Sequence, residues 1–184
     1  MRTILYRRFP GAVTRKSWTV GLLAVFGVTM LAGPGPAAAT VGDLACTVSS
    51  TITYSPGITL TPSNQTVTWS VQYSGCTSTT GATVTTGSRG GSITRERSCL
   101  AVEPPLDGTR TITWNDATTS VVDSTGLAVD AGGQTVYTIT GTVISGRFTG
   151  DTFLEVVTQS SLNLLACATT GVTSQTGTGA VTFA

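Results

Sequence analysis

Apolar and hydroxyl-bearing residues alternate with a period of two along much of this 184-residue chain. The clearest run is 67–73, VTWSVQY, in which every second residue is apolar or aromatic. Successive side chains of a β-strand point to opposite faces, so this pattern predicts a strand with one buried and one exposed face. The same pattern, or a short β-branched run, recurs at 48–54, 111–114, 136–139, 143–144, 153–157 and 180–183.

Glycine and proline interrupt these runs at short intervals. Pro56-Gly57 is expected to end the first strand, Gly132-Gly133 to form a turn, and the segment 87–91, GSRGG, to form a hairpin turn. No stretch has a helical period beyond one short turn at 161–167. About eight or nine short strands with frequent turns predict an all-β domain, an antiparallel β-sandwich or barrel.

The four cysteines are Cys46, Cys76, Cys99 and Cys167. An even number of cysteines in an exported chain predicts two disulfides, and four cysteines allow three pairings. We favour Cys46–Cys76 with Cys99–Cys167, because the first two bracket a strand–loop–strand and would meet at the open end of that antiparallel pair. The spacing lacks C-x-x-C and the chain has no histidine, so no metal site is predicted.

Residues 1–39 have the order of a secretory signal peptide. Four basic residues lie between positions 7 and 16, an uncharged and mostly apolar run follows at 18–32, and Ala37–Ala39 supplies small residues for cleavage. The apolar run is shorter than the roughly 20 residues that a membrane-spanning helix needs. We therefore expect 40–184 to be a single secreted, extracellular β domain with no membrane span in the mature form.

Residues 40–184 contain five arginines and nine acidic residues, a net charge of −4, and no lysine or histidine. Without those bases, Ser-His-Asp and Ser-Lys catalysis is excluded, and the acidic balance argues against a nucleic-acid partner. Two-carboxylate hydrolysis remains open, but Asp151 and Glu155 would lie about 13 Å apart on one strand face, too far for glycosidase geometry. We therefore predict no catalytic residues and no cofactor.

Three arginines and one aromatic residue are candidates for binding. Arg95 and Arg97 share one face of a predicted strand, and with Arg89 they could accept acidic groups. The favoured alternative for these charges is protection of an edge strand against association. Phe148 is the aromatic residue expected on a loop, whereas the two tryptophans after residue 39 occupy alternating apolar positions and are expected in the core.

Several segments together resemble a group of small secreted proteins of streptomycete type that contain four cysteines. These segments are Tyr54–Pro62, Tyr73–Cys76, Ser98–Leu100, Thr111–Trp114, Gly141–Val143, Gly146–Asp151 and Cys167 with Gly171–Ser174. The resemblance implies an exported, disulfide-linked β domain and assigns no catalytic residue. The composition is also similar to that of the enediyne-carrier apoproteins, which are secreted β-sandwiches with two disulfides.

These observations predict a secreted, non-enzymatic binding or surface-associated module of unknown partner, with the cell wall or a small molecule as candidates. The alternative is an extracellular carrier that holds a small apolar ligand in a cleft. A two-carboxylate hydrolase is the third class.

Overall fold

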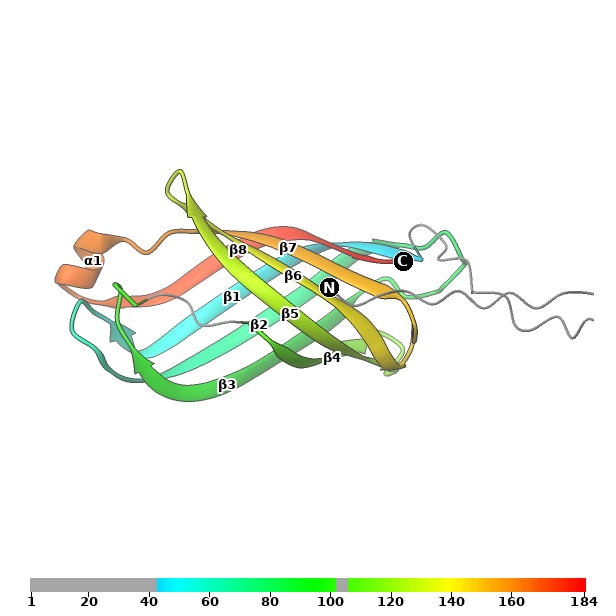
Figure 1. Cartoon of the computed structure of the whole chain (residues 1–184), viewed down its shortest axis with the longest axis horizontal. Helices are drawn as coiled ribbons and strands as arrows, with labels where there is room; N and C mark the ends of the chain where they lie inside the picture. The colour runs from blue at the N-terminus through cyan, green and yellow to red at the C-terminus, as the bar shows by residue number, and fades with distance from the viewer. Residues whose placement is uncertain (1–42, 102–105) are drawn as a thin grey trace, which may run out of the picture. The chain divides into compact units, whose positions relative to one another are not determined.

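The structure, a computed structural model, describes residues 43–101 and 106–184. The predicted signal peptide at 1–39 lies outside the described residues. Eight strands and one short helix make up the described part of the chain (Figure 1). They are β1 (Leu44–Ile58), β2 (Ser63–Thr77), β3 (Gly87–Arg97), β4 (Gly108–Trp114), β5 (Thr119–Ala131), β6 (Gln134–Gly146), β7 (Thr152–Ser160), α1 (Leu164–Ala168) and β8 (Val172–Phe183).

The eight strands form one closed barrel in which each strand neighbours the next in sequence. All pairs are antiparallel, and β1 pairs with β8 from Leu44↔Phe183 to Ile58↔Val172 to complete the ring. The all-β prediction is confirmed, and of the two expected architectures the chain adopts the barrel. Closure removes most of the free strand edges that an open sheet would expose.

Two of the predicted turn signals do not end strands. Pro56-Gly57 lies within β1, and the predicted hairpin turn at 87–91 is instead the first half of β3. The glycines of β3 make room for aromatic rings, because a Cβ at Gly91 would clash with the Trp69 ring and a Cβ at Gly87 with the Trp114 ring. The strands are consequently longer than expected, with 15 residues each in β1 and β2.

Aromatic side chains fill the end of the barrel where β4 turns into β5 and β6 into β7. Tyr73, Trp114, Phe148, Phe153 and Phe183 form a chain of ring contacts with centroids 5.3 to 6.0 Å apart. Phe148 is partly buried and packs against the main cluster of buried apolar residues, to which the other four belong. Such tilted and edge-on contacts are the favoured geometry of aromatic pairs, so this end of the barrel is closed by a well-packed core.

Helix α1 and a smaller apolar cluster lie at the opposite end. Tyr54, Ile58 and Val67 form this cluster, with Cys99 and other partly buried side chains packed against it. Asn163 caps α1, since its side-chain oxygen accepts hydrogen bonds from the N–H groups of the first helical turn. The helical turn expected at 161–167 is thus present.

Both predicted disulfides are confirmed. Cys46 is bonded to Cys76 near the aromatic end, and Cys99 is bonded to Cys167, which ties the segment after β3 to α1. Two disulfides fit a protein that resides in an oxidising compartment. Within the described residues, no helix has the length and apolar character needed to cross a membrane.

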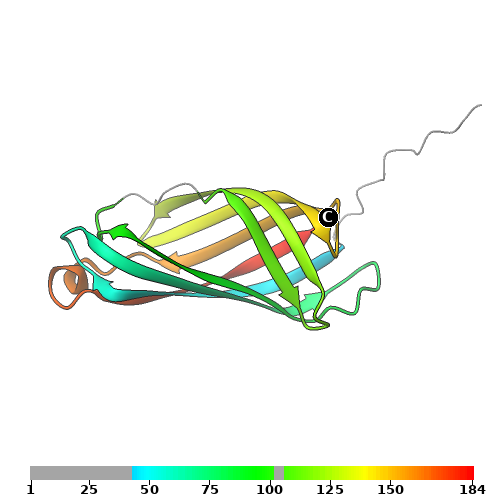
Figure 2. The same ribbon diagram turned by 90° about the horizontal axis from the view of Figure 1, so that it is seen from below.

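The barrel wall is weakest between β3 and β4. These strands pair only at Gly87↔Trp114 and Ser88↔Thr113. On its other side β3 pairs with β2 over its whole length, from Ser63↔Arg97 to Tyr73↔Gly87. Figure 2 shows β3 and β4 diverging from the point where they meet. We call this line of separation the β3–β4 seam.

Candidate ligand-binding site

A cavity of about 410 Å³ lies inside the barrel, lined by residues from six of its strands and from the segment before β4. Much of the lining is apolar or aromatic: Ile52, Tyr54, Val67, Trp69, Val71, Ile93, Leu106, Tyr137, Ile139 and Val157. The lining includes side chains of the main core cluster as well as of the smaller cluster at the α1 end. The cavity therefore occupies the length of barrel between the two packed ends.

The charges around this cavity are strongly biased. Four of the five arginines that follow residue 39 line it, namely Arg89, Arg95, Arg97 and Arg110. Of the eight acidic residues that the structure describes, only Glu155 and Asp107 do so. A domain that is acidic as a whole thus surrounds its cavity with a positive excess.

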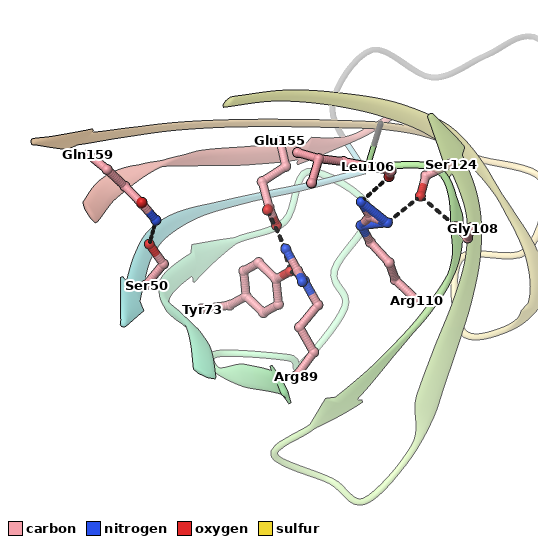
Figure 3. Close-up of polar contacts among 9 residues, drawn as sticks. All are labelled: Ser50, Tyr73, Arg89, Leu106, Gly108, Arg110, Ser124, Glu155 and Gln159. Atoms are coloured by element: carbon pink, nitrogen blue, oxygen red, sulfur yellow. Dashed lines mark hydrogen bonds and ion pairs between the residues drawn. The ribbon is translucent and has the colours of Figure 1, made fainter. Parts of the chain in front are cut away.

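One arginine is neutralised deep in the barrel by a buried triad (Figure 3). Arg89 Nη2 donates to Glu155 Oε1 at 2.5 Å, Arg89 Nε donates to Tyr73 Oη at 2.8 Å, and Tyr73 Oη donates to Glu155 Oε2 at 2.6 Å. Tyr73 and Glu155 are each 1% exposed. Both oxygens of the carboxylate are engaged, so Glu155 serves as the counter-charge of Arg89.

The triad also sets the protonation states of its members. Burial raises the pKa of the Tyr73 phenol far above its ordinary value, and the Glu155 charge adds to this effect. Burial alone would lower the pKa of the Arg89 guanidinium, but its interactions with Tyr73 and Glu155 raise it. The phenol therefore stays protonated and the guanidinium stays charged, which keeps all three hydrogen bonds in place.

Arg110 lies on β4, and its hydrogen-bond partners in the described part of the chain are neutral oxygens. Its Nη1 donates to Ser124 Oγ at 2.9 Å and its Nη2 donates to the Leu106 carbonyl at 2.5 Å (Figure 3). Burial lowers the pKa of this guanidinium, and the positive charge of Arg89 lowers it further. The Arg110 charge is thus held in place by hydrogen bonds, and no carboxylate of the described residues is bonded to it.

Unused hydrogen-bonding capacity remains at the cavity. Arg95 makes no side-chain hydrogen bond or ion pair within the described residues, and its Nε is buried. On the opposite wall Gln159 Nε2 donates to Ser50 Oγ at 3.1 Å, while its Oε1 is buried without a partner in the described part of the chain. Buried polar groups are nearly always paired, so these atoms mark places where a polar group of a ligand would be accommodated.

The structure brings together three of the four predicted binding residues. Arg89, Arg95 and Arg97 all line the cavity. Phe148 does not, because it packs against Trp114 and Phe183 in the aromatic end of the barrel.

Three further cavity residues were not predicted, although the alternation of the strands carries the signal. Arg110 shares parity with the apolar face of 111–114, and Glu155 and Gln159 share parity with that of 153–157. A charged residue on the buried face of a strand must find a partner or line a cavity.

Asp151 and Glu155, the two carboxylates considered for hydrolysis, do not both line the cavity. Glu155 lines the cavity, whereas Asp151 does not and instead lies beside Asp43. Among the residues that the structure describes, no cluster of three histidine, cysteine or acidic side chains could hold a metal ion. The arrangement is suited to binding, with an apolar wall and fixed positive charges.

Comparisons with protein-family models, with curated proteins and with solved structures found no match. The resemblance to small secreted four-cysteine proteins therefore stays a prediction from the sequence, and the function must be inferred from the cavity itself.

Proposed function

We propose that this protein is a secreted carrier that binds a small, largely apolar molecule inside its barrel. The observation that supports this function is the cavity of about 410 Å³, partly open to solvent, with its mainly apolar lining. Pockets for small ligands typically measure about 300–1,000 Å³ and combine apolar walls with a few polar groups. Eight-stranded barrels are also just wide enough to hold one small ligand.

The β3–β4 seam supplies a route for the ligand. Along most of these two strands there is no ladder of hydrogen bonds to break, because they pair at only two positions. Separating them further would therefore disturb few backbone contacts. Thr109, Thr111 and Ile93 line the cavity from the two strands that border the seam.

Export from the cell is part of the proposal. It is supported by the order of basic, apolar and small residues in 1–39 and by the two disulfides. A carrier outside the cell needs a stable barrel and a shielded interior. Here the disulfides tie the chain together near both ends of the cavity.

The test is a titration of the mature domain with N-phenyl-1-naphthylamine, a neutral aromatic probe that fluoresces in apolar surroundings. We expect saturable binding of one probe per barrel. Ile52→Trp should abolish it, because Ile52 lines the cavity and the larger indole ring would occupy the space of the probe. Leu154→Trp is the matched control, since Leu154 lies on β7 with 44% exposure and does not line the cavity.

The two variants make the result specific to the cavity. A probe that binds wild type and Leu154→Trp but not Ile52→Trp supports the proposal. Absence of binding to the wild type, or equal binding to all three proteins, would refute it. Circular dichroism should confirm that each variant retains the β-barrel.

A further inference from the structure

We propose that the ligand is an amphipathic anion whose acidic group is held by Arg95 and Arg110, on the two strands that flank the β3–β4 seam. This inference rests on the proposed carrier function and adds to it the chemical class of the ligand. The apolar body would lie against the aliphatic and aromatic lining of the barrel interior. A carboxylate, sulfonate or phosphate would occupy the positive region at the seam.

The first support is the segregation of charge. Residues 40–184 carry more acidic than basic residues, yet among the described residues all but one of the five arginines, and only two of the eight acidic residues, line the cavity. Arginine is seldom buried without a partner, because removing its charge from water is unfavourable. A protein that held only a neutral apolar molecule would gain nothing from this concentration of guanidinium groups.

The second support is that Arg89 and Arg95, which both lie on β3, differ in their hydrogen-bond and ion-pair partners. Arg89 is neutralised by Glu155 and Tyr73. Arg95 has no side-chain hydrogen bond or ion pair within the described residues, although its Nε is buried. The charge of Arg95 is thus available to a ligand, whereas that of Arg89 is not.

The third support comes from Arg110 on the other side of the seam. Within the described residues, its two side-chain hydrogen bonds go to neutral oxygens of Ser124 and Leu106 and use two of the five N–H donors of a guanidinium. The hydrogen bonds fix its position, and its Nε is buried without a partner in the described residues. A fixed cation with unused donors is the arrangement that favours an anionic group, since charge-assisted hydrogen bonds are the strong ones.

The position of these arginines agrees with an amphipathic ligand. Trp69 and Val67 on β2, together with Ile52 on β1, provide apolar cavity wall on strands that do not border the seam. A ligand could therefore insert its apolar body into the barrel while its acidic group remains between β3 and β4.

The test compares two probes with the same aromatic body. 1-Anilinonaphthalene-8-sulfonate carries a sulfonate, and N-phenyl-1-naphthylamine lacks it. Arg95→Gln and Arg110→Gln are each compared with Arg147→Gln, which removes the same charge outside the cavity. Arg147 pairs with Asp116 in the turn regions at the aromatic end. Because Arg95 makes no side-chain hydrogen bond or ion pair with the described residues, its replacement should leave the fold intact.

We expect Arg95→Gln and Arg110→Gln each to weaken the binding of the sulfonate probe by about tenfold, which corresponds to about 1.4 kcal/mol. The neutral probe should bind both variants as it binds wild type, and this result also shows that the cavity has kept its shape. A loss of sulfonate affinity in either variant that Arg147→Gln does not show supports the proposal.

The proposal is overturned if both variants bind the sulfonate probe as tightly as Arg147→Gln does, or if the neutral probe loses affinity in parallel. In the first case the neutral probe still binds, so the carrier function stands and only the anionic ligand is refuted. If neither probe binds the wild-type protein, the carrier function itself fails.

Discussion

Replacing Glu155 by glutamine tests whether the triad holds the interior of the barrel together. The substitution keeps the shape of the side chain but removes its negative charge. Arg89 would then be left charged and mostly buried, with 12% of its side chain exposed. Tyr73 would lose the carboxylate oxygen that accepts its hydroxyl proton at 2.6 Å.

The expected loss follows from the burial of the pair. Removing one partner of a buried ion pair typically costs about 3–5 kcal/mol. We expect the lower end, about 3 kcal/mol, because the glutamine oxygen can still accept from Arg89 and the neighbouring cavity gives that arginine some access to water. For a domain of this size the loss corresponds to a decrease of about 6–12 °C in the melting temperature.

Urea unfolding with both disulfides intact measures this change. Tryptophan fluorescence can follow the transition, because the ring centroid of Trp114 lies 6.0 Å from that of Tyr73, a member of the triad. The matched control is Asp116→Asn, which removes the acid of the surface pair with Arg147. Exposed ion pairs contribute little, so this variant should unfold at nearly the same urea concentration as wild type.

A second variant separates the charge from the packing. Arg89→Met combined with Glu155→Leu removes both charges and should be more stable than Glu155→Gln alone, because no unpaired charge remains buried. If the unfolding free energy of Glu155→Gln lies within about 1 kcal/mol of the wild-type value, the Arg89–Glu155 pair contributes no more than an exposed ion pair. The reasoning from its burial is then wrong.

Three further outcomes are expected. Replacing Cys99 and Cys167 together by serine should lower the unfolding free energy by up to about 4 kcal/mol in urea titrations, since the bond closes a loop with a sequence separation of 68. Burial raises the pKa of Asp151, so its charge destabilises the fold as the pH rises above about 4; Asp151→Asn should therefore raise the melting temperature at pH 7 but not at pH 3. In Gly91→Ala the new methyl group must displace the Trp69 ring, which should shift the tryptophan emission and weaken binding of the neutral probe.

The fold was predictable from the sequence where local pattern and tertiary environment agree. Alternation identified most strands and the fold class, and the bracketing of one strand pair by cysteines indicated the correct disulfides. The two Gly-Gly dipeptides show the limit. Gly132-Gly133 forms the two-residue turn between β5 and β6, with positive φ angles of 59° and 77°, whereas Gly90-Gly91 continues β3. The difference comes from the Trp69 ring packed across β3, a tertiary contact that the local sequence does not reveal.

The candidate site was predictable in part, for a related reason. Arg95 and Arg97 share parity, so a common strand face could be inferred for them. Arg89, predicted in a turn, lies on the same strand, and all three line the cavity. The sequence alone does not show that this face points into a barrel with Glu155 opposite. That arrangement depends on the pairing of β1 with β8, which closes the barrel. Phe148 was expected on a loop, and it does follow β6, but its ring turns back into the core.

The sparse pairing of β3 with β4 has a consequence for the order in which the strands could be connected. Every other neighbouring pair in the ring has a longer ladder, including β8 with β1. In terms of backbone pairing, the barrel is therefore a rolled meander that begins at β4, runs through β8 and β1, and finishes at β3. A circularly permuted chain, with β8 joined to β1 by a short linker and new termini between β3 and β4, would preserve every long ladder. The connection that it would cut is the chain segment between β3 and β4.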